Sequence, residues 1–268
     1  MLAVGFTLIF GVARVLNLSH GSFYALGAYG AYVYNGVLGI PLLPAALLSV
    51  ATVALFGMLV ERALVRPLRR SALAVLMITL ATSLLVEQLL FLIFGSEYRN
   101  VRSFVREKIT LAAVDISGQR LLTLACGVAL VVTLWLFIQR TKLGAAILAV
   151  SQDPEAAQHV GINTDRIFSV VMAISAALAA AAGVLVAPFL TVQPGMGLLP
   201  MTKAFSIVIL GGLGSIPGSL LAALLLGYSE TIVAYAFSSS FTELVSLVAI
   251  LLTLILRPAG LFGKRAAF

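Results

Sequence analysis

Residues 167–187 read IFSVVMAISAALAAAAGVLVA and contain no charged side chain. A helix needs about 17 to 25 mostly apolar residues to cross a bilayer, so this stretch is long enough to span one. Similar apolar runs occupy residues 43–60 and 121–138. Hydrophobic residues make up 61% of the 268 residues and charged residues only 10%, whereas a soluble domain carries about 25% charged residues. The sequence therefore predicts an integral membrane protein.

The apolar runs also predict the fold class. Segments inside a bilayer must satisfy their own backbone hydrogen bonds, which leaves helices or closed β-barrels, and barrel strands alternate polar and apolar residues. Continuous Leu, Ala and Val runs predict an all-α polytopic bundle. About eight membrane segments are expected, starting near residues 2, 21, 43, 73, 121, 167, 203 and 219, with another near 241. Residues 203–210 and 241–256 are short for a straight crossing, so broken or re-entrant helices are expected.

The basic residues predict the orientation of the bundle. A net charge of +7 could indicate a nucleic-acid partner, but Lys and Arg also flank membrane helices on the cytoplasmic side, and the composition favours that explanation. The loop that holds Arg62, Arg66, Arg69 and Arg70 and the loop at about 140–166 are therefore both expected inside the cell, with residues 96–120 outside. The C-terminal tail joins the inner side if residues 203–210 cross. No removable signal peptide precedes the first helices, so these are expected to direct insertion.

The loop at about 140–166 is predicted to contain a short capped helix. Asp153 can accept hydrogen bonds from the free amides at the start of a helix, and Pro154 suits the first helical position. Glu155 complements the positive end of the helix dipole, and Gly161 suits a left-handed C-terminal cap. Asn163 or Thr164 can cap the following membrane helix. A passive connection does not need a capped helix, so we expect this loop to be a docking element.

The same loop carries part of a known signature. Glu155-Ala156-Ala157 followed after three residues by Gly161 resembles the first half of the cytoplasmic loop of ABC-importer permeases, although the usual continuation is missing. That resemblance implies that the helix sits in a groove on a separate ATPase, where the small Ala156 and Ala157 permit close contact. The alternative is a surface helix that only fixes the loop.

Three further stretches extend the resemblance to essentially the whole chain. They are NLSHGSFY at 17–24 with LGAY at 26–29, GINTDR at 161–166, and KAF at 203–205 leading to LGGLGSIPG at 210–218. Together they resemble the branched-chain amino-acid ABC-transporter permease family, specifically its first permease subunit. Members of this family usually carry a further stretch before the residue numbered 1 here. The start of the chain is therefore expected to have been assigned late, or the first membrane helix to be absent.

The resemblance implies one permease domain over residues 1–268 in the inner membrane of a bacterial or archaeal cell. It implies a second related permease subunit, two cytoplasmic ATPases and a periplasmic binding protein that delivers leucine, isoleucine, valine or a related solute. Relatives that move urea, amides or aromatic acids, and a secondary transporter, stay as alternatives. No enzymatic activity, metal, cofactor or nucleic-acid partner is expected, because neither histidine begins a His-Glu-x-x-His pattern and no Gly-x-Ser-x-Gly elbow occurs.

Polar residues within the apolar runs are candidates for the translocation path or its hinges. The stretch 17–21 interrupts two apolar runs, and Thr79, Ser83 and Glu87 recur every four residues on one helix face. The glycines at 211–218 lack the Gly-Lys-Ser/Thr ending of a phosphate loop, so a hinge between half-helices is expected. The full candidate set is Asn17, Ser19, His20, Gly21, Thr79, Ser83, Glu87, Gly211, Gly212, Gly214 and Glu230.

Two alternatives stay open for the ionisable candidates. His20 either binds a proton or the solute, or it is a hydrogen-bonded histidine that stabilises a broken helix. Glu87 and Glu230 either face the lumen or form structural ion pairs, because a charged carboxylate within the bilayer must face the bundle interior, water or a counter-ion.

Overall fold

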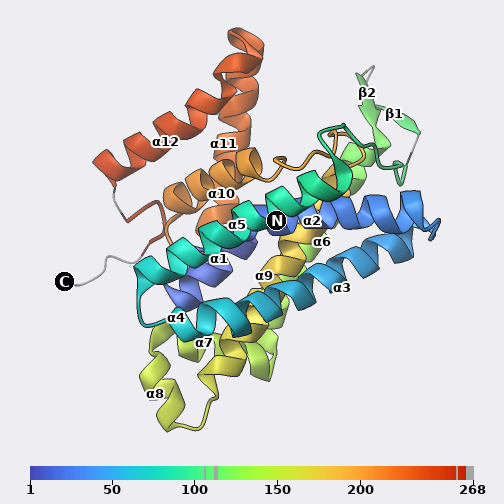
Figure 1. Ribbon diagram of the computed structural model, residues 1–268. Coiled ribbons are helices and arrows are strands. Elements are labelled where there is room, and N and C mark those ends of the chain that lie inside the picture. Colours follow the sequence, from blue (N-terminus) through green and yellow to red (C-terminus); the bar gives the residue numbers. More distant parts are fainter. Residues whose placement is uncertain (106, 112–113, 258, 264–268) are drawn as a thin grey trace.

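The computed structural model describes residues 1–105, 107–111, 114–257 and 259–263 (Figure 1). Its helices are α1 (Leu2–Ala13), α2 (His20–Ala31), α3 (Leu42–Val60), α4 (Arg66–Leu68), α5 (Ala72–Phe94), α6 (Gly118–Arg140), α7 (Lys142–Gln152), α8 (Pro154–His159), α9 (Thr164–Val186), α10 (Leu198–Gly211), α11 (Ile216–Ala236) and α12 (Thr242–Leu256). The π-helical turns η1 (Tyr32–Val37) and η2 (Glu61–Val65) extend α2 and α3, and the 3-10 turn η3 (Ser239–Phe241) precedes α12. Strands β1 (Lys108–Leu111) and β2 (Val114–Ser117) form an antiparallel hairpin.

The predicted helical membrane bundle is confirmed. Within the described residues, five helical stretches are long and apolar enough to cross a membrane: Leu42–Leu68, Ala72–Phe94, Gly118–Arg140, Thr164–Val186 and Ile216–Ala236. Three shorter apolar helices, α1, α10 and α12, accompany them. Every predicted segment corresponds to one of the helices, although α10 begins at Leu198 rather than near residue 203. The β1–β2 hairpin, within the expected outer loop, is an element that the sequence did not indicate.

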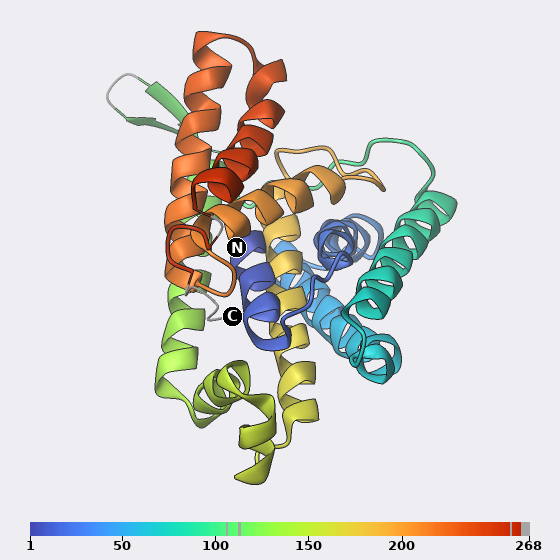
Figure 2. The same cartoon turned by 90° about the vertical axis from the view of Figure 1, so that its left-hand side faces the viewer.

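Helix α9, the stretch that indicated a membrane protein, forms the centre of the bundle (Figure 2). In its apolar window 67% of the residues are buried, compared with 17 to 28% in the other four long stretches. Small residues allow its backbone to approach α2 and α3 closely. A side chain at Gly183 would collide with the carbonyl oxygen of Tyr24, and one at Gly27 would collide with the backbone of Ala180. Association of helices within a bilayer depends on such close packing, because burial of apolar surface gives little drive there.

The two ends of the bundle carry different elements. In both overall views α8 lies at one end and the β1–β2 hairpin at the other (Figures 1 and 2). Arg66 and Arg69 form ion pairs with Asp165 at the start of α9. The basic loop after α3 therefore lies at the α8 end, as the charge pattern predicts.

Helix α10 runs back toward the α8 end. It starts beside α2, where Gly197 and Gly21 approach each other, and the turn after it brings Gly214 against Gly11 near the end of α1. The amide of Leu261 donates to the carbonyl of Leu210 at 2.9 Å. The described C-terminal residues thus pack beside the end of α10, and the side of the membrane that they face stays a prediction.

Substitution of Gly183 by Val should destabilise the fold. The added side chain has no room against α2, and overpacking a dense core costs about 1 to 3 kcal/mol. Thermal melting of the purified protein in detergent, followed by size-exclusion chromatography, measures the effect. Gly227→Val in α11 is the matched control, because no atom lies within 4 Å of a side chain added there. Equal melting temperatures for the two variants would contradict the close packing of α2 and α9.

Candidate functional site: a membrane cavity and the loop at one end

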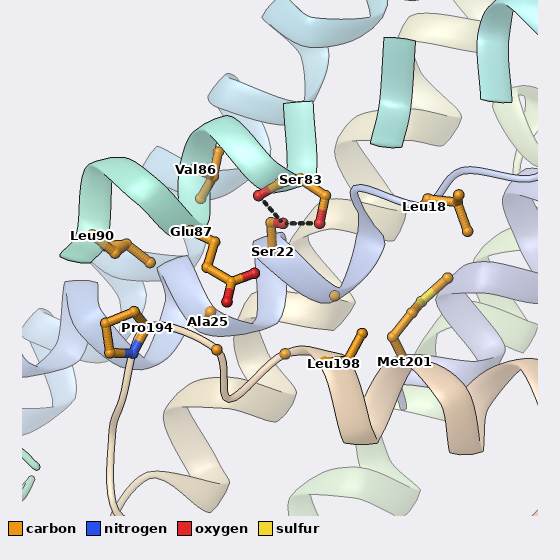
Figure 3. Close-up of a pocket in the computed structure, with 13 residues that line it drawn as sticks. Leu18, Ser22, Ala25, Ser83, Val86, Glu87, Leu90, Pro194, Leu198 and Met201 are labelled. Atoms are coloured by element: carbon orange, nitrogen blue, oxygen red, sulfur yellow. Dashed lines mark hydrogen bonds between the residues drawn. The ribbon is translucent and has the colours of Figure 1, made fainter. Parts of the chain in front are cut away.

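A cavity of about 50 Å³ lies where α2 begins, α5 passes and the segment before α10 turns (Figure 3). A water molecule needs roughly 10 to 15 Å³ of such space, while small-molecule pockets measure about 300 to 1,000 Å³. The cavity therefore has room for a few water molecules, and a solute would need the walls to separate. It is lined by Leu18, Gly21, Ser22, Ala25, Ser83, Val86, Glu87, Leu90, Pro194, Gly195, Gly197, Leu198 and Met201.

An interrupted segment before α2 shapes one wall of this cavity. The chain leaves α1 at Arg14, whose φ of 52° is left-handed, and becomes helical again at His20. Between them the Asn17 side-chain oxygen accepts from the amide of Ser19 at 3.1 Å and from its hydroxyl at 2.6 Å. The predicted interruption is therefore present. Because neither Gly21 nor Gly197 has a side chain, the starts of α2 and α10 come into contact beside the cavity.

The polar stripe of α5 faces this interrupted segment. The hydroxyls of Ser83 and Ser22 share a hydrogen bond of 2.8 Å (Figure 3). The Thr79 hydroxyl accepts from the amide of Leu18 at 3.2 Å. Glu87 lines the cavity, and no described residue forms a hydrogen bond or an ion pair with its carboxylate. A charge within a membrane helix costs about 2.5 to 3.5 kcal/mol on insertion scales, so it should face a water-filled space. Within the described residues Glu87 lacks the ion pair of one interpretation, and its lumen-facing role stays a prediction.

His20 and Ser19 lie outside the cavity and are fully buried. Nε2 of His20 is 2.9 Å from the carbonyl oxygen of Leu2, and Nδ1 is 3.3 Å from the hydroxyl of Ser175. Its ring packs between Phe6 and Phe23. These contacts fix the start of α2 against α1 and α9. They support the structural interpretation of His20, in which it stabilises a broken helix.

Glu230 and the glycines after α10 also lie away from the cavity. Glu230 accepts from Lys203 at 2.7 Å and from Ser246 at 3.0 Å, so it joins α10, α11 and α12. It forms a structural ion pair, one of its two alternatives, with a lysine of α10. The turn at Gly211, Gly212 and Gly214 packs backbone against backbone, with φ of 100° at Gly212 and 85° at Gly214. Its role as a hinge stays a prediction.

A second small cavity lies toward the α8 end and is closed by an ion cluster. Asn17 and Thr79 line it together with Glu61 and Arg69. Glu61 is only 3% exposed; it pairs with Arg69 and accepts from the Ser169 hydroxyl at 2.5 Å.

Arg69 bridges this ion cluster to Asp165 at 3.0 Å and lies 4.0 Å above the ring of Phe168. The sequence pattern indicated only a topological role for Arg69 and no role for Glu61. An acidic residue directly after an apolar run, eight positions before a basic one, was the available signal.

The loop between α6 and α9 has the predicted caps. Asp153 accepts from the amides of Glu155 and Ala156 at 2.9 and 3.0 Å, and Gly161 has a φ of 86°. Asn163, rather than Thr164, caps α9 by accepting from the amide of Arg166. The expectation of one short helix was incomplete, because α7 precedes α8 as a separate helix of 11 residues.

Two contacts connect this loop to the membrane helices. Arg14, at the end of α1, donates to the carbonyls of Ser151 and Gln152 at 3.5 and 3.3 Å. Gln158 in α8 donates to Thr164 in α9 at 2.6 Å. The outer side of α8 stays open, with Val160 76% exposed. The loop is therefore tied to the segment that shapes the cavity and still presents a free face.

Comparison with known proteins now identifies the family. The model for the permease component of branched-chain amino acid transport systems matches residues 1–256. The chain belongs to this family. It is 32% identical to the permease BraD of Pseudomonas aeruginosa and 28% identical to LivH of Escherichia coli, in each case over 98% of this chain and 91% of the relative. Both relatives are described as high-affinity branched-chain amino acid transport permeases.

A solved structure supports the fold as well. PsaBC from Streptococcus pneumoniae, in complex with a Fab, aligns with a TM-score of 0.51 at 14% identity, over 96% of this chain and 89% of the other. At this identity the likeness concerns the fold alone. The permease is thus a multi-pass membrane protein whose helices share the arrangement of that chain.

Arg69→Gln should destabilise the permease strongly, because it leaves Glu61 buried without a counter-charge. Breaking a buried ion pair on one side costs about 3 to 5 kcal/mol. The double variant Glu61→Gln with Arg69→Gln removes both charges and should recover most of the melting temperature in detergent. A double variant that melts as low as the single one would show that the pairing with Glu61 does not stabilise the fold.

Proposed function

We propose that this permease forms the pore of an ATP-driven importer for leucine, isoleucine and valine in the inner membrane. The observation that carries the proposal is the capped helix α8, which projects from the bundle with Glu155 and Ala156 exposed and is tied to α9 through Gln158. The preceding helix α7 is tied to the end of α1 through Arg14. A passive loop needs none of these features. The proposed partners are a second permease subunit, two cytoplasmic ATPases that dock on α8, and a periplasmic binding protein, with lipid around the bundle.

Arg14 and Asp165 offer two routes from α8 to the path. When the ATPases close, displacement of α7 and α8 pulls on Arg14, and through it on the interrupted segment 15–19 that forms the cavity wall. The same displacement moves the start of α9, where Asp165 holds Arg69. Both routes are short and consist of named polar contacts, which lets a rigid displacement outside the membrane alter packing within it.

The two cavities give the proposed path a direction. The solute enters the cavity beside Glu87, passes the constriction at Leu18 and Thr79, and reaches the second cavity beside Asn17. Release toward the cytoplasm then requires Arg69 to separate from Asp165 and Glu61. Alternating access in this scheme opens one cavity while the other stays closed.

Reconstitution in proteoliposomes with the partner subunits tests the proposal. Glu155→Lys with Ala156→Leu should lower ATP-dependent uptake of radiolabelled leucine by at least about tenfold, because charge reversal and added bulk on the exposed face disrupt the docked helix. Ala157 is 4% exposed and packs toward the bundle, so it is left unchanged. Glu107→Lys, an exposed acid beside the β1–β2 hairpin, is the control for charge reversal and should leave uptake unchanged.

Three outcomes would contradict parts of this proposal. Normal uptake in the double variant would contradict docking at α8. Leucine uptake without ATP would indicate a secondary transporter instead. Uptake of urea or amides in place of leucine, isoleucine and valine would reassign the substrate.

Arg14→Gly tests the connection between the loop and the cavity. Glycine adopts φ of 52° without strain, so the fold should be as stable or more stable by about 1 kcal/mol. The donors to α7 are lost, so fewer leucine molecules should be imported for each ATP hydrolysed. Parallel assays of uptake and phosphate release measure this ratio. An unchanged ratio would remove Arg14 from the transmission route.

A further inference from the structure

We infer that Glu87 is the specificity-determining group of the path, whose carboxylate binds the ammonium of a zwitterionic aliphatic solute. This inference rests on the proposed import function and deepens it. It concerns the cavity beside α2, α5 and the start of α10, into which the Glu87 side chain points (Figure 3).

Its position within α5 places the Glu87 carboxylate inside the membrane. Helix α5 runs from Ala72 to Phe94, and seven residues separate Glu87 from its end. At a rise of about 1.5 Å per residue, Glu87 lies about 10 Å inside the helix end. At this depth an ionised group requires a counter-charge or water, so the surroundings of Glu87 decide what it can do.

Glu61, which is buried, and Glu230, which is partly buried, have cationic partners, whereas the Glu87 side chain is exposed. Glu61 pairs with Arg69, and Glu230 pairs with Lys203. Glu87 has neither an ion pair nor a hydrogen bond within the part of the chain that the structure describes. Gly195 lies directly against it, since a side chain there would come within 3.1 Å of Oε1, so the absence of a side chain leaves the carboxylate uncovered. The counter-charge of Glu87 is therefore supplied by the solute that enters the cavity.

The rest of the lining indicates the kind of solute. Leu18, Val86, Leu90 and Met201 give the cavity an apolar wall, which suits an aliphatic side chain. Among the described residues no lysine or arginine lines it, so a carboxylic acid without an amino group has no cationic partner there and is repelled by Glu87. The same carbon skeleton is thus accepted as the amino acid and rejected as the corresponding 2-keto acid. This discrimination by charge acts in the path itself and adds to any selection by a binding protein.

Cysteine modification tests the charge preference without transport. In a Cys126→Ser background, which removes the native cysteine, Ser83→Cys places a thiol in the cavity. The introduced thiol should be modified faster by the cationic aminoethyl methanethiosulfonate than by the anionic sulfonatoethyl methanethiosulfonate. Adding Glu87→Gln should lower this ratio by about tenfold, because the carboxylate no longer concentrates the cation. Glu97→Gln, the same change at an exposed site ten residues further on, should leave it unchanged.

An equal ratio with and without Glu87 would overturn the inference, as would a thiol that neither reagent reaches. Transport then separates this inference from the proposed function. In the reconstituted importer, Glu87→Gln should lower kcat/KM for leucine by roughly tenfold or more, the loss expected for one charge-assisted contact. Wild-type leucine uptake by Glu87→Gln would refute the role of Glu87 and leave the import function standing. Absence of leucine uptake by the unaltered importer would refute the import function, while the reagent ratio would still decide the role of Glu87.

Discussion

The close contact between α2 and α9 is the constraint on which the rest of this permease depends. Gly27 and Gly183 lie where the two backbones meet, and any side chain at either position would collide with the facing helix. Lipid is as apolar as leucine, so helices in a bilayer associate through such shape complementarity rather than by burying apolar surface. With α2 held in this place, its first turn can meet α10 at Gly197 and α5 at Ser83, and the cavity lies between them.

Charge within the bundle follows a second constraint. An ion in hydrocarbon needs a partner or water, and Glu61 and Glu230 satisfy that need with Arg69 and Lys203. The pair of Glu230 and Lys203 joins α11 to α10, and Arg69 connects Glu61 to Asp165 at the start of α9. Glu87 differs because it faces a space instead of a cation. The contrast separates acidic residues that stabilise the bundle from one that is available to a solute.

The interrupted segment before α2 joins the outer parts of the molecule to this space. Arg14, directly before it, contacts α7, and Leu18 within it lines the cavity. His20 fixes the following helix through polar contacts to α1 and α9. A short irregular stretch between anchored helices can change conformation with little cost to the packing around it, which is why broken helices recur at transport paths.

The sequence alone determined the membrane location, the all-helical class and the caps of α8. The membrane location follows from the length of the apolar runs. The capping of α8 by Asp153 and Gly161 depends only on neighbours within a few residues. The regular spacing of Thr79, Ser83 and Glu87 likewise placed them on one face of α5. Contacts between distant segments required the tertiary structure, because sequence spacing carries no information about which helices pack together. Only the tertiary structure shows that Glu87 lines a cavity while Glu230 is paired with Lys203. It also places His20 outside that cavity, and it shows that Arg69 contacts both Glu61 and Asp165.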